Sequence, residues 1–268
     1  MRQQPSLARL LASAALTAIL ATGLGGCQTT SDITGSLTPK AEASPDSDPH
    51  RAVETYGERY RADPKNADAA LAYGQALRAT GQRSQAAAVL EQATIAHPGD
   101  KALLAGYGRA LADNGNFQSA FEVLSRAHSP DNPDWRILSV QGTALDQLGR
   151  HDEARQYYAS ALKIVPDEPS VLSNLGLSYV LSKDLPKAEE VLRQAYASTR
   201  ADARVRQNLA LVVGLQGRFA EAETIVRADL PADEAAANVA YLKQMLSHKD
   251  NPRTSAARVP VASLNRPD

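Results

Sequence analysis

The chain has 268 residues, of which 43% are hydrophobic and only 5% aromatic. This length is enough for one or two domains with a buried core, and the abundance of alanine and leucine favours closely packed helices. A formal net charge of -1 argues against the basic surface that nucleic-acid binding requires. The single cysteine excludes an internal disulfide, and the five histidines lack the short spacing of metal ligands on one helix. We therefore expect no nucleic-acid partner, no metal and no cofactor.

The first 26 residues have the layout of a secretory signal peptide. Residues 1–9 are short and positively charged, residues 10–24 form an uncharged run rich in Leu and Ala, and two glycines follow. The apolar run is shorter than the roughly 20 residues that a membrane-spanning helix needs. The pattern therefore favours a cleaved signal, and an uncleaved anchor is the alternative.

The segment Leu24-Gly25-Gly26-Cys27 resembles the bacterial lipobox, in which small residues precede a lipidated cysteine. The resemblance implies that Cys27 carries the lipid as the first residue of the mature chain; the alternative is a lone buried cysteine. Several acyl chains together make a firm membrane anchor. By resemblance to the enterobacterial sorting rule, Gln28 implies the outer membrane, facing the periplasm, and the inner membrane stays open as an alternative.

Two segments are too polar to form a core. Residues 27–49 are rich in Ser, Thr, Pro and Asp, and they cannot bury enough apolar surface to offset the entropy of ordering them. We predict that they form a lipidated, disordered tether, and that residues 249–268 form a disordered tail. The folded part is then predicted over residues 50–248.

Small residues recur every 34 positions in this folded part. The first set is Gly74, Gly108, Gly142, Gly176 and Ala210; the second is Ala86, Ala120, Ala154, Ala188 and Ala222; the third is Gly81, Gly115, Gly149 and Gly217, with Lys183 in the remaining place. Period and residue types resemble the tetratricopeptide repeat (TPR), a pair of antiparallel helices. The resemblance implies an all-α, right-handed TPR α-solenoid of about five helix-pair repeats.

The 34-residue period also predicts the repeat boundaries. The repeats cover residues 67–100, 101–134, 135–168, 169–202 and 203–230, and a half-repeat helix over residues 51–62 precedes them. The packing slot that is tryptophan in the family holds Arg206 in the fifth repeat, which makes this repeat the least regular. A helical pattern with Ala236, Val239, Leu242 and Met245/Leu246 on one side predicts a C-terminal capping helix that covers the last open face.

No residue pattern points to catalysis, so we expect neither an enzyme nor a small-molecule substrate. Adjacent acidic residues do not face each other on a helix, and His151 occupies a packing slot of the repeat. By resemblance to other TPR arrays, exposed positions of the first helices line a groove that binds extended peptides, although ordinary solvated surface is the alternative. These positions are Asp68, Gln75, Arg78, Arg109, Asp113, Arg136, Thr143, Asp146, Gln147, Asn174 and Asn208. The groove is expected to continue as an apolar surface that is either open or covered by the capping helix. This surface is formed by Leu177, Val180, Leu181, Leu211 and Leu215.

The ending of the chain, residues 208–246, resembles the TadD family of TPR lipoproteins from tight-adherence (Flp) pilus systems. The resemblance implies a pilotin-like factor that assists an outer-membrane secretin or another pilus assembly component. Two alternatives stay open: a general periplasmic TPR scaffold that organises peptidoglycan enzymes, and an accessory subunit of a hydrolase. The sequence leaves the partner, its binding motif and the oligomeric state undetermined.

Overall fold

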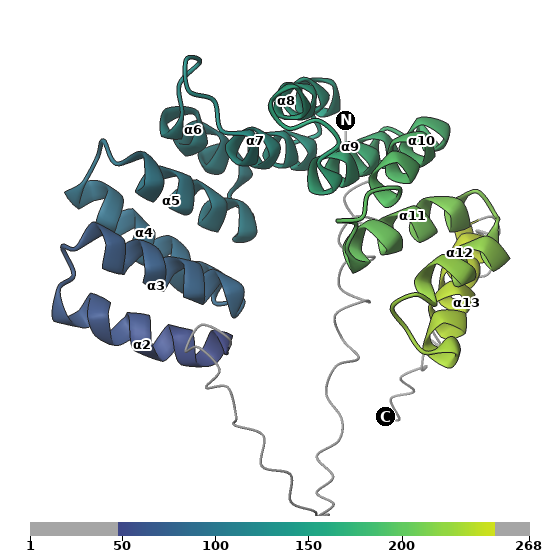
Figure 1. Ribbon diagram of the computed structural model, residues 1–268, viewed down its shortest axis with the longest axis horizontal. Helices are drawn as coiled ribbons and strands as arrows, with labels where there is room; N and C mark the ends of the chain where they lie inside the picture. The colour runs from purple at the N-terminus through teal and green to yellow at the C-terminus, as the bar shows by residue number, and fades with distance from the viewer. Residues whose placement is uncertain (1–47, 250–268) are drawn as a thin grey trace, which may run out of the picture. The chain divides into compact units, whose positions relative to one another are not determined.

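A computed structural model describes residues 48–249 of the chain, with side chains up to Ser247 (Figure 1). These residues contain twelve α-helices and no strand, which confirms the predicted all-α solenoid. The predicted signal peptide, Cys27, almost all of the tether and nearly all of the tail lie outside the described residues. No helix in the described part is both long and apolar enough to cross a bilayer.

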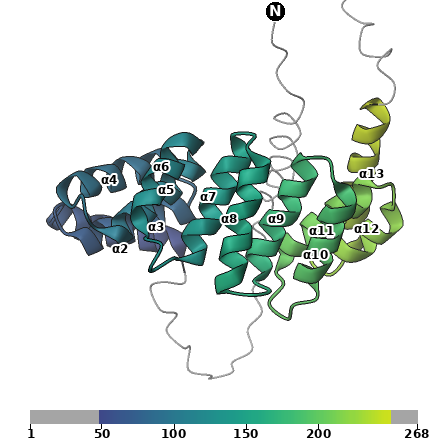
Figure 2. The same ribbon diagram turned by 90° about the horizontal axis from the view of Figure 1, so that it is seen from above.

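The helices belong to two compact units, one up to Ile164 and one from Val165 onward. The first unit contains α2 (Pro49–Ala62), α3 (Ala67–Ala79), α4 (Arg83–Ala96), α5 (Lys101–Asp113), α6 (Phe117–Ala127), α7 (Trp135–Gln147) and α8 (His151–Ile164). The second contains α9 (Pro169–Leu181), α10 (Leu185–Tyr196), α11 (Ala203–Leu215), α12 (Phe219–Val226) and α13 (Ala232–Lys249). Within each unit, consecutive helices lie side by side (Figures 1 and 2).

The first helix of every repeat begins at the residue that the 34-residue period predicts. Each of these helices, α3, α5, α7, α9 and α11, is preceded by a polar residue whose side chain accepts a hydrogen bond from a backbone N–H of the first turn. These N-cap residues are Asn66, Asp100, Asp134, Glu168 and Asp202. The half-repeat helix begins at Pro49, two residues earlier than predicted, because the Asp48 side chain caps it.

The periodic small residues allow the two helices of a repeat to approach closely. A Cβ atom built on Gly108 would lie 2.5 Å from Cγ of Leu124, well inside the 3.5–4.0 Å of a normal carbon contact. The same spacing relates the other first-helix glycines to large side chains of the second helices: Gly74 to Leu90, Gly142 to Tyr158, and Gly176 to Leu192. These four large side chains are at most 1% exposed, so in each of the first four repeats a large buried residue packs directly over a glycine.

The turn between the two helices of a repeat needs a left-handed residue. Gly81, Gly115, Gly149 and Gly217 have φ between 75° and 83°, a conformation that glycine adopts without strain. Lys183 occupies the equivalent place with φ 65°. The following Asp184 donates its N–H to the carbonyl of Tyr179 at 2.9 Å, the bond that closes a helix end of the Schellman type. The fourth repeat therefore keeps the turn geometry without the glycine that makes it favourable.

The irregular fifth repeat is stabilised by an ion pair. Arg206 stands in the packing slot, and its Nε donates to Oδ2 of Asp229 at 2.7 Å. A second donor, Nη1, bonds the carbonyl of Ala201 at 2.9 Å. The guanidinium thus satisfies its polar groups while its aliphatic stem stays half-buried.

The C-terminal helix α13 packs on α11 and α12, as expected of a capping helix. Its contact stripe contains the fully buried Ala235 and the half-buried Val239, Leu242 and Leu246. Ala236, which the sequence pattern placed on this stripe, is exposed, because residues 235, 239, 242 and 246 follow the helical period more closely. The five apolar positions of the expected groove continuation, Leu177, Val180, Leu181, Leu211 and Leu215, are all half-buried.

Candidate functional site

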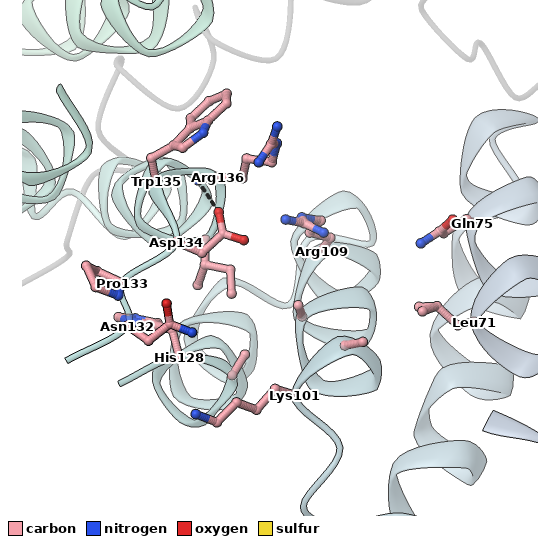
Figure 3. Close-up of a pocket in the computed structure, with 14 residues that line it drawn as sticks. Leu71, Gln75, Lys101, Arg109, His128, Asn132, Pro133, Asp134, Trp135 and Arg136 are labelled. Atoms are coloured by element: carbon pink, nitrogen blue, oxygen red, sulfur yellow. Dashed lines mark hydrogen bonds between the residues drawn. The ribbon is translucent and has the colours of Figure 1, made fainter. Parts of the chain in front are cut away.

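A pocket of about 500 Å³ lies in the first unit, on the side of the first helices (Figure 3). Its walls come from α3, α5, the end of α6, the loop between α6 and α7, and the start of α7. The lining residues are Leu71, Gln75, Lys101, Ala102, Ala105, Arg109, Ala127, His128, Asn132, Pro133, Asp134, Trp135, Arg136 and Ile137. Its volume falls within the range of ligand sites.

The loop wall exists because α6 is short. This helix has 11 residues, whereas α4 and α8 have 14 each. Since the repeat period is unchanged, residues 128–134 form a longer connection to α7. Pro130 and Pro133 disfavour continuation of the helix through this stretch, and Asn132 donates its N–H to the carbonyl of Ser129 at 3.0 Å. The connection supplies Asn132, Pro133 and Asp134 to the pocket.

Arg109 is the central charged group of the pocket. Its side chain is half-buried, and among the described residues it has no hydrogen bond or ion pair. The pKa of Arg109 lies below its ordinary value because burial removes water from the guanidinium and because Arg78 and Arg136 are nearby cations, an effect that Asp134 partly offsets. Arginine still stays charged in proteins. The structure thus places an unpaired, partly desolvated cation in the pocket.

The two neighbouring arginines are already engaged. Arg78 donates from Nε to Oδ2 of Asp113 at 2.6 Å. The guanidinium carbon of Arg136 lies 4.6 Å from the centre of the Trp135 ring, within the range of a cation–π contact. Arg109 is therefore the member of this group that is most available to a ligand.

The structure brings three of the residues predicted from sequence, Gln75, Arg109 and Arg136, into one pocket. Figure 3 shows Gln75 on α3 and Arg109 on α5 among the residues that line the pocket. The Arg78–Asp113 pair lies outside the lining but close enough for Arg78 to influence Arg109.

The other predicted residues lie elsewhere. Asp68 and Gln147 are exposed but do not line the pocket. Thr143 donates to the carbonyl of Ser139 at 3.1 Å. In the second unit, Asn208 donates to Oγ of Ser173 at 2.8 Å and Asn174 is half-buried.

Asp146 has a structural role that the sequence pattern did not predict. Its side chain is only 6% exposed and accepts a hydrogen bond from the Tyr158 hydroxyl at 2.9 Å. Nδ1 of His151 lies 2.9 Å from its other oxygen. Burial raises the pKa of Tyr158, and the neighbouring Asp146 carboxylate raises it further. The carboxylate therefore belongs to the interior of the third repeat rather than to an open groove.

Sequence reasoning did not assign Trp135, Asp134, Lys101 or His128 to a site. One signal was present, since Trp135 is the single tryptophan of the chain and stands at the first position of a first helix. His128 places Nε2 3.0 Å from Oε1 of Gln141, and its Nδ1 is buried without a partner.

The pocket offers groups for recognition. Its lining includes three cationic side chains, Lys101, Arg109 and Arg136, one carboxylate, Asp134, and the indole ring of Trp135. Within residues 48–249, no group of three or more His, Cys, Asp or Glu side chains is arranged to hold a metal ion. The arrangement suits an anionic, extended ligand.

Comparison with known proteins agrees with this architecture. Sequence profiles of the tetratricopeptide repeat match residues 74–134, 136–201 and 203–228. A thermophilic TPR protein of Thermus thermophilus is 23% identical with a TM-score of 0.59, over 67% of this chain and 100% of its own. A tetratricopeptide repeat protein of Parabacteroides merdae is 15% identical with a TM-score of 0.59, over 76% of this chain and 83% of its own. PilF of Pseudomonas aeruginosa is 19% identical with a TM-score of 0.52, over 70% of this chain and 93% of its own.

At these identities the solved structures show a shared fold alone. No curated protein matches the sequence.

Proposed function

We propose that this chain, which belongs to the tetratricopeptide-repeat family, binds a protein partner through the first-helix pocket and acts in the assembly of a pilus or secretion system at the cell envelope. Repeats of this family form protein-interaction scaffolds. In this chain we assign the binding face to the first-helix pocket and the biological setting to the cell envelope.

The observation that carries the binding part is the pocket built jointly by three repeats. The half-buried Arg109 loses stabilisation from water, and the charge of Asp134 restores only part of it, so a ligand that supplies an anion is favoured. Helical repeats present such groups on successive first helices, and an extended peptide can contact several at once.

The setting rests on the sequence. The ending over residues 208–246 is similar to TadD lipoproteins, and the lipobox-like segment that ends at Cys27 supports a membrane-attached protein. Gln28 supports the outer membrane, facing the periplasm. A pilotin-like factor held there would meet an outer-membrane secretin at a high effective concentration, because both are attached to the same membrane.

Deletion of the gene tests the setting. We expect fewer secretin multimers and fewer surface pili, with growth close to normal, and we expect a Cys27→Ala strain to lose lipid labelling. Normal multimers and normal piliation in the deletion strain would contradict the assembly role and favour a scaffold for peptidoglycan enzymes. Normal lipid labelling of Cys27→Ala would contradict the anchor.

A further inference from the structure

We infer that the pocket between α3, α5 and α7 recognises a carboxylate side chain of an extended acidic peptide segment, and that Arg109 is the residue that binds it. The inference rests on one element of the proposed function, namely that a protein partner binds to this face. It adds the chemistry of the ligand.

The first argument is the state of Arg109. Its guanidinium is half-buried without a partner among the described residues, and Arg78 and Arg136 add repulsion between like charges. A carboxylate that enters the pocket would relieve this repulsion and accept two parallel N–H···O bonds from the planar guanidinium. Because the guanidinium is already partly desolvated in the free protein, binding a carboxylate requires less further desolvation of Arg109.

The second argument is Asp134, which favours a peptide over a free or polymeric phosphate. Its Oδ1 accepts the backbone N–H of Arg136 at 2.7 Å, and its charge acts on Arg109. A doubly charged phosphate, or a chain of phosphates, would be repelled by this carboxylate. A peptide brings one carboxylate for Arg109 together with backbone N–H donors, which Asp134 and Gln75 can accept.

The third argument is the apolar part of the lining. The half-buried Leu71 lines the pocket with the buried Ala105 and Ile137, and the Arg136 guanidinium lies over the half-buried Trp135 ring. An acidic residue next to an aliphatic one would bury its neighbour on this surface while the carboxylate reaches Arg109. The ligand is therefore an acidic segment with aliphatic neighbours.

Trp135 provides a direct measurement of binding. It is the only tryptophan in the chain, so its fluorescence reports on this pocket alone. The full chain, purified in detergent, is titrated with a capped hexapeptide that carries one glutamate between leucine residues. The matched probe is the same peptide with glutamine in place of glutamate. We expect a saturable change in emission, with the glutamate peptide binding at least about 10-fold more tightly than the glutamine peptide.

Three variants separate the role of Arg109 from a general effect of charge. Arg109→Gln should weaken binding of the glutamate peptide by roughly 10- to 100-fold. Arg83→Gln removes the same charge from an exposed site of the same unit outside the pocket, and it should leave binding within about 2-fold, since exposed charges are screened. Asp134→Asn keeps an N-cap for α7 but removes the negative charge, so it should tighten binding several-fold. Circular dichroism establishes that each variant is folded.

Three outcomes would overturn the inference: equal binding of the two peptides, Arg109→Gln binding as tightly as the wild type, or inorganic phosphate binding as tightly as the glutamate peptide. The last result would identify a general anion site. Failure of peptide binding alongside a loss of pili in the deletion strain would refute the ligand chemistry alone. Peptide binding alongside normal pili would contradict only the assembly role.

Discussion

Gly108→Ala tests whether the close contact between Gly108 and Leu124 limits how tightly α5 and α6 pack. The added Cβ would lie 2.5 Å from Cγ and 2.6 Å from Cδ2 of Leu124, and 3.4 Å from the carbonyl oxygen of Ala120. Leu124 is fully buried, and the nearest atom is its branch point Cγ, which a rotation about χ2 does not move. Helices α5 and α6 would have to separate.

The magnitude follows from two opposing terms. Overpacking of this kind costs about 1–3 kcal/mol, and the geometry places Gly108→Ala in the upper half of that range. Alanine is better than glycine inside a helix by about 1 kcal/mol. We therefore expect a net loss of about 1–2 kcal/mol in the free energy of unfolding, measured by denaturant titration with helical circular dichroism.

A double-mutant cycle with Leu124→Ala isolates the contact. Leu124→Ala alone should cost about 2–5 kcal/mol, but it removes the atoms that the new Cβ would strike. In that background, Gly108→Ala should be neutral or stabilising by up to about 1 kcal/mol. Gly99→Ala is the control, because its Cβ would meet no atom within 4 Å. A stabilising Gly108→Ala, or the same effect in both backgrounds, would refute the reasoning.

Three further predictions follow from the described helices. Lys183→Gly should raise the free energy of unfolding by about 0.5–1 kcal/mol in denaturant titration, because relief of about 1–2 kcal/mol of left-handed strain exceeds the added chain entropy; a loss of stability would contradict this. Tyr158→Phe should lower it by about 1–3 kcal/mol, since the buried Asp146 loses a hydrogen-bond donor, and an unchanged midpoint would show that the hydroxyl is dispensable. A chain that ends at Leu230 lacks α13 and should bind a hydrophobic dye or aggregate, whereas a soluble chain that does not bind the dye would show that Ala235 and its neighbours cover nothing essential.

The fold was largely predictable because each repeat is fixed by contacts inside one period. A glycine at one position and a large side chain 16 residues later set the approach of two helices, as Gly142 and Tyr158 illustrate. The helix starts were predicted for the same reason. The series of capping residues from Asn66 to Asp202 carries the same period and is an independent signal in the sequence.

The candidate site was predictable only in part. The 34-residue period placed Gln75, Arg109 and Arg136 on the correct face, because it specifies which positions of a first helix point away from its partner. It did not predict the wall formed by residues 128–134, since this connection has no counterpart of equal length in the other repeats. It placed Asp146 in the groove, whereas the Tyr158 hydroxyl makes burial of that carboxylate favourable.

The availability of Arg109 depends on which partner Asp113 takes. The two residues are four apart on α5, a spacing at which opposite charges commonly pair, so local sequence alone would pair them and leave Arg78 free. In the structure, Asp113 instead accepts from Arg78 on α3 at 2.6 Å. This pairing between repeats neutralises Arg78, joins α3 to α5, and leaves Arg109 in the pocket without an ion-pair partner among the described residues. The charge of the candidate site is therefore a property of the stacked repeats, because no single repeat contains both residues of the ion pair.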